Sequence, residues 1–101
     1  MIEYKIEIVE GRKKYPVMLF ANPQYALLSE FFLAERSFLK ELKRFVKANE
    51  QQFSGNAFTL YQNADSITLE NDMNDASLTV NRKDFYSLLC VYYDACKKLR
   101  K

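Results

Sequence analysis

The chain has 101 residues, of which 49% are hydrophobic and 28% are charged, and its formal net charge is +2. This balance is typical of a single globular domain spanning residues 1–101, and it excludes a disordered or fibrous chain. The sequence has neither a long apolar run typical of a membrane span nor the basic start of a signal peptide. We therefore expect a cytoplasmic protein without a membrane partner.

The first elements are predicted to form a β-hairpin. From Ile2 to Ile8, apolar residues at every second position alternate with charged ones, as in a strand with one buried face. Gly11 suits the turn that follows, and residues 15–20 resume an extended apolar run. Pro16 has no N–H group to donate, so it either begins this second strand or places the strand at a sheet edge.

A long helix is predicted next. Asn22 is a suitable N-cap and Pro23 a suitable first helical residue, and the helical pattern ends near Ala48 or Asn49. Glu35 falls near the apolar stripe, where we expect it to lie at the margin, because a buried lone charge is unfavourable. The stripe itself has the three- and four-residue spacing of an amphipathic helix and comprises Leu28, Phe31, Phe32, Leu39, Leu42, Phe45 and Val46.

Three short antiparallel strands and a second helix complete the prediction. The strands have alternating apolar and hydroxyl-bearing residues and cover 58–61, 67–70 and 77–80. The turns between them are rich in Asn and Asp, which hydrogen-bond their own backbone and tolerate left-handed conformations. Asn81 is the expected N-cap of the helix that follows.

The predicted order is therefore ββαβββα, an α+β fold in a single domain. We expect an antiparallel or mixed sheet with two helices packed on one face. The other face is expected to carry the polar residues of the strands, namely Glu3, Lys5, Glu7, Thr59, Tyr61, Thr68, Glu70, Ser77 and Thr79.

Charge is distributed unevenly along the chain. From Ala48 to Asn81 there are five acidic residues and no basic one, which gives this segment a net charge of −5. Residues 1–47 carry nine basic and six acidic residues (+3), and residues 82–101 carry six and two (+4). A local negative field of this kind attracts basic partners, although part of the segregation is explained by the low lysine content of short strands and turns.

Several kinds of chemistry are not indicated. Without histidine, the chain cannot form a serine–histidine triad or a histidine metal site, and its two separate glycines form no phosphate-binding loop. The acidic turn at residues 70–75 lacks the central glycine and final glutamate of a calcium loop, so we interpret it as an Asx-rich turn. We expect no catalytic residue, no metal and no cofactor. A small enzyme using carboxylates would require a deep pocket holding a carboxyl group with a raised pKa.

The segment Ser77-Leu78-Thr79-Val80-Asn81-Arg82-Lys83-Asp84-Phe85-Tyr86-Ser87-Leu88-Leu89, together with the order of the elements, resembles small immunity proteins of bacterial contact-dependent growth inhibition systems. It also looks like a family of small enterobacterial proteins with a similar strand-to-helix ending. The first resemblance implies a cytoplasmic protein that binds a toxin domain, often a nuclease, and blocks its active site or substrate path.

Two functional hypotheses follow. The first is an immunity or antitoxin-like inhibitor, because an acidic surface complements the basic cleft of a nuclease. Its predicted contact residues lie in or beside the acidic segment: Tyr61, Asp65, Glu70, Asp72, Asn74 and Asp75. The alternative is a small nucleic-acid-binding domain that contacts phosphates through the first long helix. Its candidate residues are Arg36, Lys40, Lys43, Arg44 and Lys47.

Overall fold

Strands and helices follow one another in a mixed order in the computed structural model, which describes residues 2–99. The α+β class is confirmed, and every paired strand is antiparallel. Short 3-10 helices at Pro23–Tyr25 and Arg36–Phe38 precede α1 and α2. The main elements are β1 (Tyr4–Glu10), β2 (Lys14–Phe20), α1 (Ala26–Ala34), α2 (Leu39–Lys47), β3 (Gln52–Ser54), β4 (Phe58–Gln62), β5 (Ser66–Asn71), β6 (Ser77–Asn81) and α3 (Arg82–Lys98).

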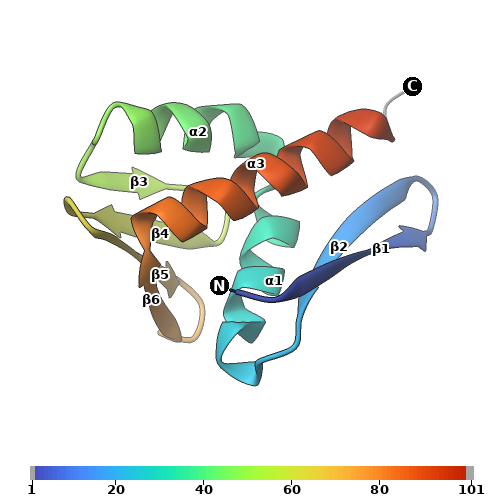
Figure 1. Cartoon of the computed structure of the whole chain (residues 1–101), viewed down its shortest axis with the longest axis horizontal. Coiled ribbons are helices and arrows are strands. Elements are labelled where there is room, and N and C mark those ends of the chain that lie inside the picture. Colours follow the sequence, from blue (N-terminus) through green and yellow to red (C-terminus); the bar gives the residue numbers. More distant parts are fainter. Residues whose placement is uncertain (1, 100–101) are drawn as a thin grey trace.

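The strands form two sheets, which corrects the prediction of a single sheet. One sheet is the β1–β2 hairpin, and the other has the order β3-β4-β5-β6. The two sheets lie on opposite sides of the molecule with α1 between them (Figure 1). The outer edge of β2 accepts side-chain donors in place of another strand, because the Tyr92 hydroxyl donates to the Pro16 carbonyl (2.8 Å) and the Ser29 hydroxyl donates to the Met18 carbonyl.

The predicted long helix is interrupted at Glu35. This residue has φ −104° and ψ 22°, and the chain continues through a 3-10 turn into α2. The two halves pack against different neighbours, since α1 contacts β2 whereas α2 lies along α3. A straight helix would carry one continuous stripe, and the break lets each half turn its apolar side toward its own neighbour.

An additional strand, β3, occupies part of the predicted connection after α2. Gln52–Ser54 pairs with β4 and forms one edge of the four-stranded sheet. Packing of Phe53 explains this placement. The centre of its ring lies 6.1 Å from that of Phe38 and 5.7 Å from that of Phe45. Burial of this ring holds a short polar segment against the helices.

Both predicted N-caps are present. The Asn22 side chain accepts a hydrogen bond from the N–H of Gln24 (3.0 Å), although the helix that it caps is the 3-10 turn before α1. The Asn81 side chain accepts from the N–H groups of Lys83 and Asp84 and caps α3. Asn22, with Pro23 after it, and Asn81 therefore begin their helices through contacts within a few residues, as their positions in the sequence predict.

The core is dominated by aromatic rings from both helices and strands. Phe31 packs edge-on against Phe58 and Phe32, and Phe32 stacks on Tyr92 with ring centroids 5.2 Å apart. Phe85 joins the same group from the first turns of α3. All five rings are fully or almost fully buried, so they tie α1, β4 and α3 into one core.

None of the helices within residues 2–99 combines the length and apolar character needed to cross a membrane.

Candidate functional site

The outer face of the four-stranded sheet carries a continuous polar surface. Alternate residues of β4 and β5, such as Leu60 and Leu69, are buried in the core, so the intervening residues point outward. We name this surface the acidic sheet face and define it by Thr59, Tyr61, Thr68, Glu70, Ser77 and Thr79, with the adjoining Asp72. Glu3, Lys5 and Glu7, which were predicted to share this face, belong to the hairpin instead.

Strand register aligns these residues in two rows. Thr59 lies opposite Glu70, which in turn lies opposite Ser77. Tyr61 lies opposite Thr68, whose hydroxyl is 2.8 Å from that of Thr79. The surface therefore combines hydroxyl groups and carboxylates with one large ring at its β4 side, that of Tyr61, which is 42% exposed.

Two carboxylates flank Thr59 on this surface. Its hydroxyl donates to Asp72 Oδ1 (2.8 Å), and Glu70 is its cross-strand neighbour. The backbone N–H of Asp72 donates to the Ala57 carbonyl (2.9 Å), which fixes the position of the carboxylate at the end of β5. Because no lysine or arginine occurs from Ala48 to Asn81, neither strand nor turn supplies a neighbouring cation within this segment.

The β5–β6 turn confirms the interpretation of an Asx-rich turn. The Asn71 side chain accepts from the N–H of Met73 (2.8 Å), and the Asn74 side chain accepts from the N–H of Ala76 (2.9 Å). Asp75 has a φ of 59°. The oxygen of Asn74, a predicted contact residue, is thus used within the turn. Sequence reasoning missed Met73, which is 86% exposed at the tip and is detectable as an apolar residue among polar turn formers.

Asp65 lies apart from the other predicted contact residues. It belongs to the β4–β5 turn, at the opposite end of β5 from Asp72, and a strand of this length separates the two ends by roughly 15–20 Å. Its carbonyl accepts from the N–H of Arg82 (2.9 Å), and its surroundings are basic. Tyr61, Glu70 and Asp72 therefore lie together on the acidic sheet face, whereas Asp65 lies outside it.

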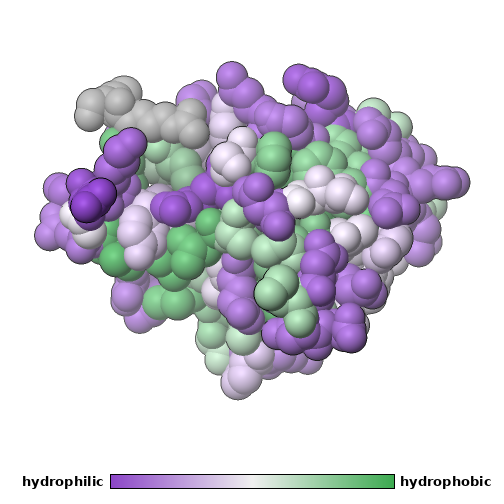
Figure 2. All heavy atoms as spheres, turned by 180° about the vertical axis from the view of Figure 1, so that it is seen from behind, coloured by the Kyte–Doolittle hydropathy of each residue, from purple (hydrophilic) through white to green (hydrophobic). Residues whose placement is uncertain are grey.

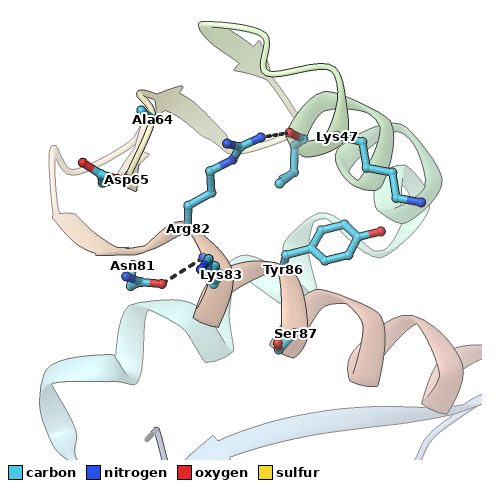
Figure 3. A pocket seen from close by; sticks show the side chains of 9 residues that line it. Lys47, Ala64, Asp65, Asn81, Arg82, Lys83, Tyr86 and Ser87 are labelled. Carbon is cyan, nitrogen blue, oxygen red and sulfur yellow. Dashed lines mark hydrogen bonds between the residues drawn. The ribbon is translucent and has the colours of Figure 1, made fainter.

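Asp65 instead lines a groove at the N-terminus of α3 (Figure 3). The groove has a volume of about 550 Å³ and contains three basic side chains, Lys47, Arg82 and Lys83. The Arg82 guanidinium reaches across to α2, where Nη2 donates to the Val46 carbonyl (2.6 Å). The other lining residues are Val46, Ala64, Asn81, Tyr86 and Ser87.

A band of lysine and tyrosine side chains continues from this groove along the junction of α2 and α3. Lys47 Nζ lies 6.0 Å from the centre of the Tyr86 ring, while Lys43 and Lys97 lie 4.7 and 5.3 Å from the Tyr93 ring. We name these five residues the lysine–tyrosine band. Tertiary packing creates it, because sequence patterns do not show that α2 and α3 run side by side.

Arg36, a predicted member of the basic helix surface, does not join this band. Its Nε donates to the Leu33 carbonyl (3.2 Å), and its guanidinium lies 4.6 Å from the centre of the Tyr15 ring. It therefore lies beside the hairpin, where it lines a second groove with Arg12, Lys13 and Lys14. The break between α1 and α2 separates Arg36 from Lys43 and Lys47.

Glu35 is fully buried, contrary to the expected marginal position. Its Oε1 accepts from the N–H of Asn56 (2.6 Å), and Oε2 accepts from those of Ala57 and Phe58 (2.8 and 3.0 Å). Three backbone donors compensate for burial of the carboxylate. Both oxygens are thereby committed to the β3–β4 turn, so this carboxylate is placed to hold a turn rather than to contact a substrate.

Comparisons of the chain with protein-family models, with curated proteins and with solved structures found no match. Within residues 2–99 no group of three or more potential ligands is arranged to hold a metal ion. The acidic sheet face and the lysine–tyrosine band are the two surfaces of the described chain that bear on its function.

Proposed function

We propose that this chain is an immunity or antitoxin-like protein that binds a cognate toxin domain, a nuclease, and blocks its active site or substrate path. The observation that carries the proposal is the placement of Glu70 and Asp72 on either side of Thr59, on a sheet face without a basic residue. Nuclease clefts hold phosphates and are basic, so two adjacent carboxylates complement them in charge. The protein acts by occupying the cleft and contributes no catalytic group.

Tyr61 and Met73 are the apolar contacts in this proposal. Tyr61 stands at the β4 end of its row on the acidic sheet face, beside the hydroxyl-bearing Thr59 and Thr68, and Met73 extends from the turn next to Asp72. A tyrosine ring provides a large rigid contact, and a methionine adapts to irregular surfaces. Charge would then guide association, while these two side chains would supply buried apolar area.

The proposal is tested with the toxin domain encoded beside the gene for this chain. Isothermal titration calorimetry measures its affinity for the wild type and for the Glu70→Lys/Asp72→Lys variant, which we expect to bind at least about a hundredfold more weakly. Asp65→Lys is the matched control, because Asp65 lies at the other end of β5. We expect less than about a threefold effect from it, as for a charge at the rim or outside an interface.

Absence of binding by the wild type would overturn the inhibitor proposal. Equal weakening by Asp65→Lys and by the double variant would retain an acidic contact but overturn the assignment to the acidic sheet face. Circular dichroism of each variant establishes that the fold is retained.

A second candidate, nucleic-acid binding, is favoured by the lysine–tyrosine band. Cations held over aromatic rings beside a groove with Arg82 and Lys83 provide both phosphate contacts and stacking surfaces. Fluorescence anisotropy with a labelled single strand and a labelled duplex tests it over a series of salt concentrations. The Lys43→Gln/Lys47→Gln variant should bind more weakly and show a shallower salt dependence. No binding by the wild type at low salt excludes this function.

A further inference from the structure

The β1 strand has one edge without a partner. The N–H of Ala21 donates to the Glu3 carbonyl (3.4 Å), so Glu3 directs its backbone groups toward β2. The direction of the backbone N–H and C=O groups alternates along a strand. The backbone groups of Lys5, Glu7 and Val9 therefore also point toward β2. Tyr4, Ile6 and Ile8 therefore direct their N–H and C=O groups to the other side, where β1 has no neighbouring strand within residues 2–99.

The two edges of the hairpin differ in how they are covered. At the β2 edge, the carbonyls of Pro16 and Met18 accept hydrogen bonds from Tyr92 and Ser29. At the β1 edge, none of the described residues forms a hydrogen bond with the outward-facing backbone groups of Tyr4, Ile6 or Ile8. An open edge of this length is a template for another strand.

Apolar side chains also remain exposed on β1. Tyr4, Ile8 and Val9 are 42%, 47% and 36% exposed, and they make up three of the five exposed large hydrophobic residues in the described chain. Seen from behind, one group of apolar residues lies on the side of the hairpin, and others lie across the middle and the opposite side of the molecule (Figure 2). The alternation from Ile2 to Ile8 predicts a buried face, and the single chain buries that face only in part.

We propose that β1 pairs antiparallel with β1 of a second copy of this chain, with Ile6 opposite Ile6 at the two-fold axis. In this register Tyr4 lies opposite Ile8 of the other copy, so the three residues with unpartnered backbone groups form hydrogen-bonded pairs with one another. The two hairpins then become one four-stranded sheet. The exposed parts of Tyr4 and Ile8 face each other across the axis.

Charge complementarity selects this register. With Ile6 at the axis, Lys5 of each copy lies opposite Glu7 of the other, on the same side of the sheet. Sliding one strand by two residues places Lys5 opposite Lys5 in one direction and Glu7 opposite Glu7 in the other. Within one chain Lys5 Nζ already lies 3.1 Å from Glu7 Oε2, and both side chains are well exposed, at 69% and 55%. In this register the contacts between copies therefore extend an existing pair of opposite charges into a group of four.

Sedimentation equilibrium over a range of concentrations is the first test, and we expect a monomer–dimer equilibrium. Hydrogen exchange at concentrations above and below the dissociation constant locates the interface. The N–H groups of Tyr4, Ile6 and Ile8 should become protected only in the dimer, whereas those of Lys5 and Glu7 already bond to β2 and should change little. A protein that remains monomeric, or a dimer without this alternating protection, overturns the proposal.

Charge variants test the register. Lys5→Glu and Glu7→Lys should each weaken the dimer roughly tenfold, because each creates two like-charge pairs. The Lys5→Glu/Glu7→Lys variant should regain wild-type affinity. An equimolar mixture of the two single variants should form a heterodimer, since one copy then presents only glutamate and the other only lysine. Unchanged dimerisation of both single variants, or a mixture that does not associate, overturns this pairing.

Discussion

Gly55 lies directly against the buried carboxylate of Glu35. A β-carbon added at Gly55 would stand 2.6 Å from Glu35 Cδ, closer than any ordinary contact. The same carboxylate accepts the backbone N–H groups of the three residues that follow Gly55 in the chain. The absence of a side chain at Gly55 and the presence of the acid at Glu35 are therefore parts of one arrangement, which connects the α1–α2 break to the β3–β4 turn.

Gly55→Ala should lower the free energy of unfolding by about 2 kcal/mol, because the added methyl group displaces a fully buried carboxylate from its three backbone donors. Urea denaturation measures the change. Gly11→Ala is the matched control, since a β-carbon at Gly11 would meet only the Lys13 carbonyl oxygen, at 3.9 Å. Equal effects from the two substitutions would show that the contact with Glu35 does not determine the loss of unfolding free energy.

Glu35→Gln should destabilise the fold by about 1–3 kcal/mol, since the amide NH2 group replaces one acceptor and faces a backbone donor. Glu35→Ala should be more damaging because it leaves all three backbone donors without the carboxylate, including the buried N–H of Phe58. Glu30→Gln, on the exposed side of α1, should have little effect and serves as the control. Denaturation midpoints that are alike for the three variants would contradict the role assigned to the buried acid.

Tyr92→Phe should cost about 1 kcal/mol at neutral pH through loss of the hydrogen bond to the Pro16 carbonyl. Burial raises the pKa of the Tyr92 hydroxyl well above its usual value. As the pH rises through about 10, the unfolded chain releases this proton and the folded chain retains it, so wild-type stability falls. The stability difference between wild type and variant should therefore shrink above that pH. A difference that stays constant in denaturation series up to alkaline pH would oppose this account.

Asp75→Val should lower the free energy of unfolding by about 1–2 kcal/mol, because a β-branched residue is strained at a φ of 59°. Asp75→Asn tolerates this conformation and should be close to neutral. The comparison separates turn geometry from charge, because both variants remove the carboxylate. Thermal denaturation of the pair provides the measurement, and an equal loss from both would assign the effect to charge.

The two proposed interfaces should respond independently. Tyr61→Ala, on the acidic sheet face, should weaken toxin binding and leave the dimer unchanged, whereas Lys5→Glu should do the reverse. Calorimetry and sedimentation on the same preparations measure both properties. The independence is expected because the hairpin and the four-stranded sheet lie on opposite sides of the molecule (Figure 1).

Sequence by itself determined the kinds of element and several of their ends. The alternation in β4 and β5, the Asx-rich turns and the caps at Asn22 and Asn81 depend on residues a few positions apart, so their outcome could be predicted. The outward direction of Tyr61 and Glu70 follows from the same alternation. The absence of basic residues on the acidic sheet face is likewise a property of the sequence.

Tertiary structure alone decided how these elements combine. Glu35 is an acid within an apolar helical pattern, and only the approach of a turn some twenty residues later explains its burial. The break in the helix depends on the different neighbours of α1 and α2. Tyr92 and Ser29 cap the outer edge of β2, so the hairpin stays separate from the four-stranded sheet at that edge. The direction of β5 carries Asp65 away from Asp72, although both belong to one acidic segment. Each of these outcomes depends on contacts between residues distant in the chain, which local periodicity does not encode.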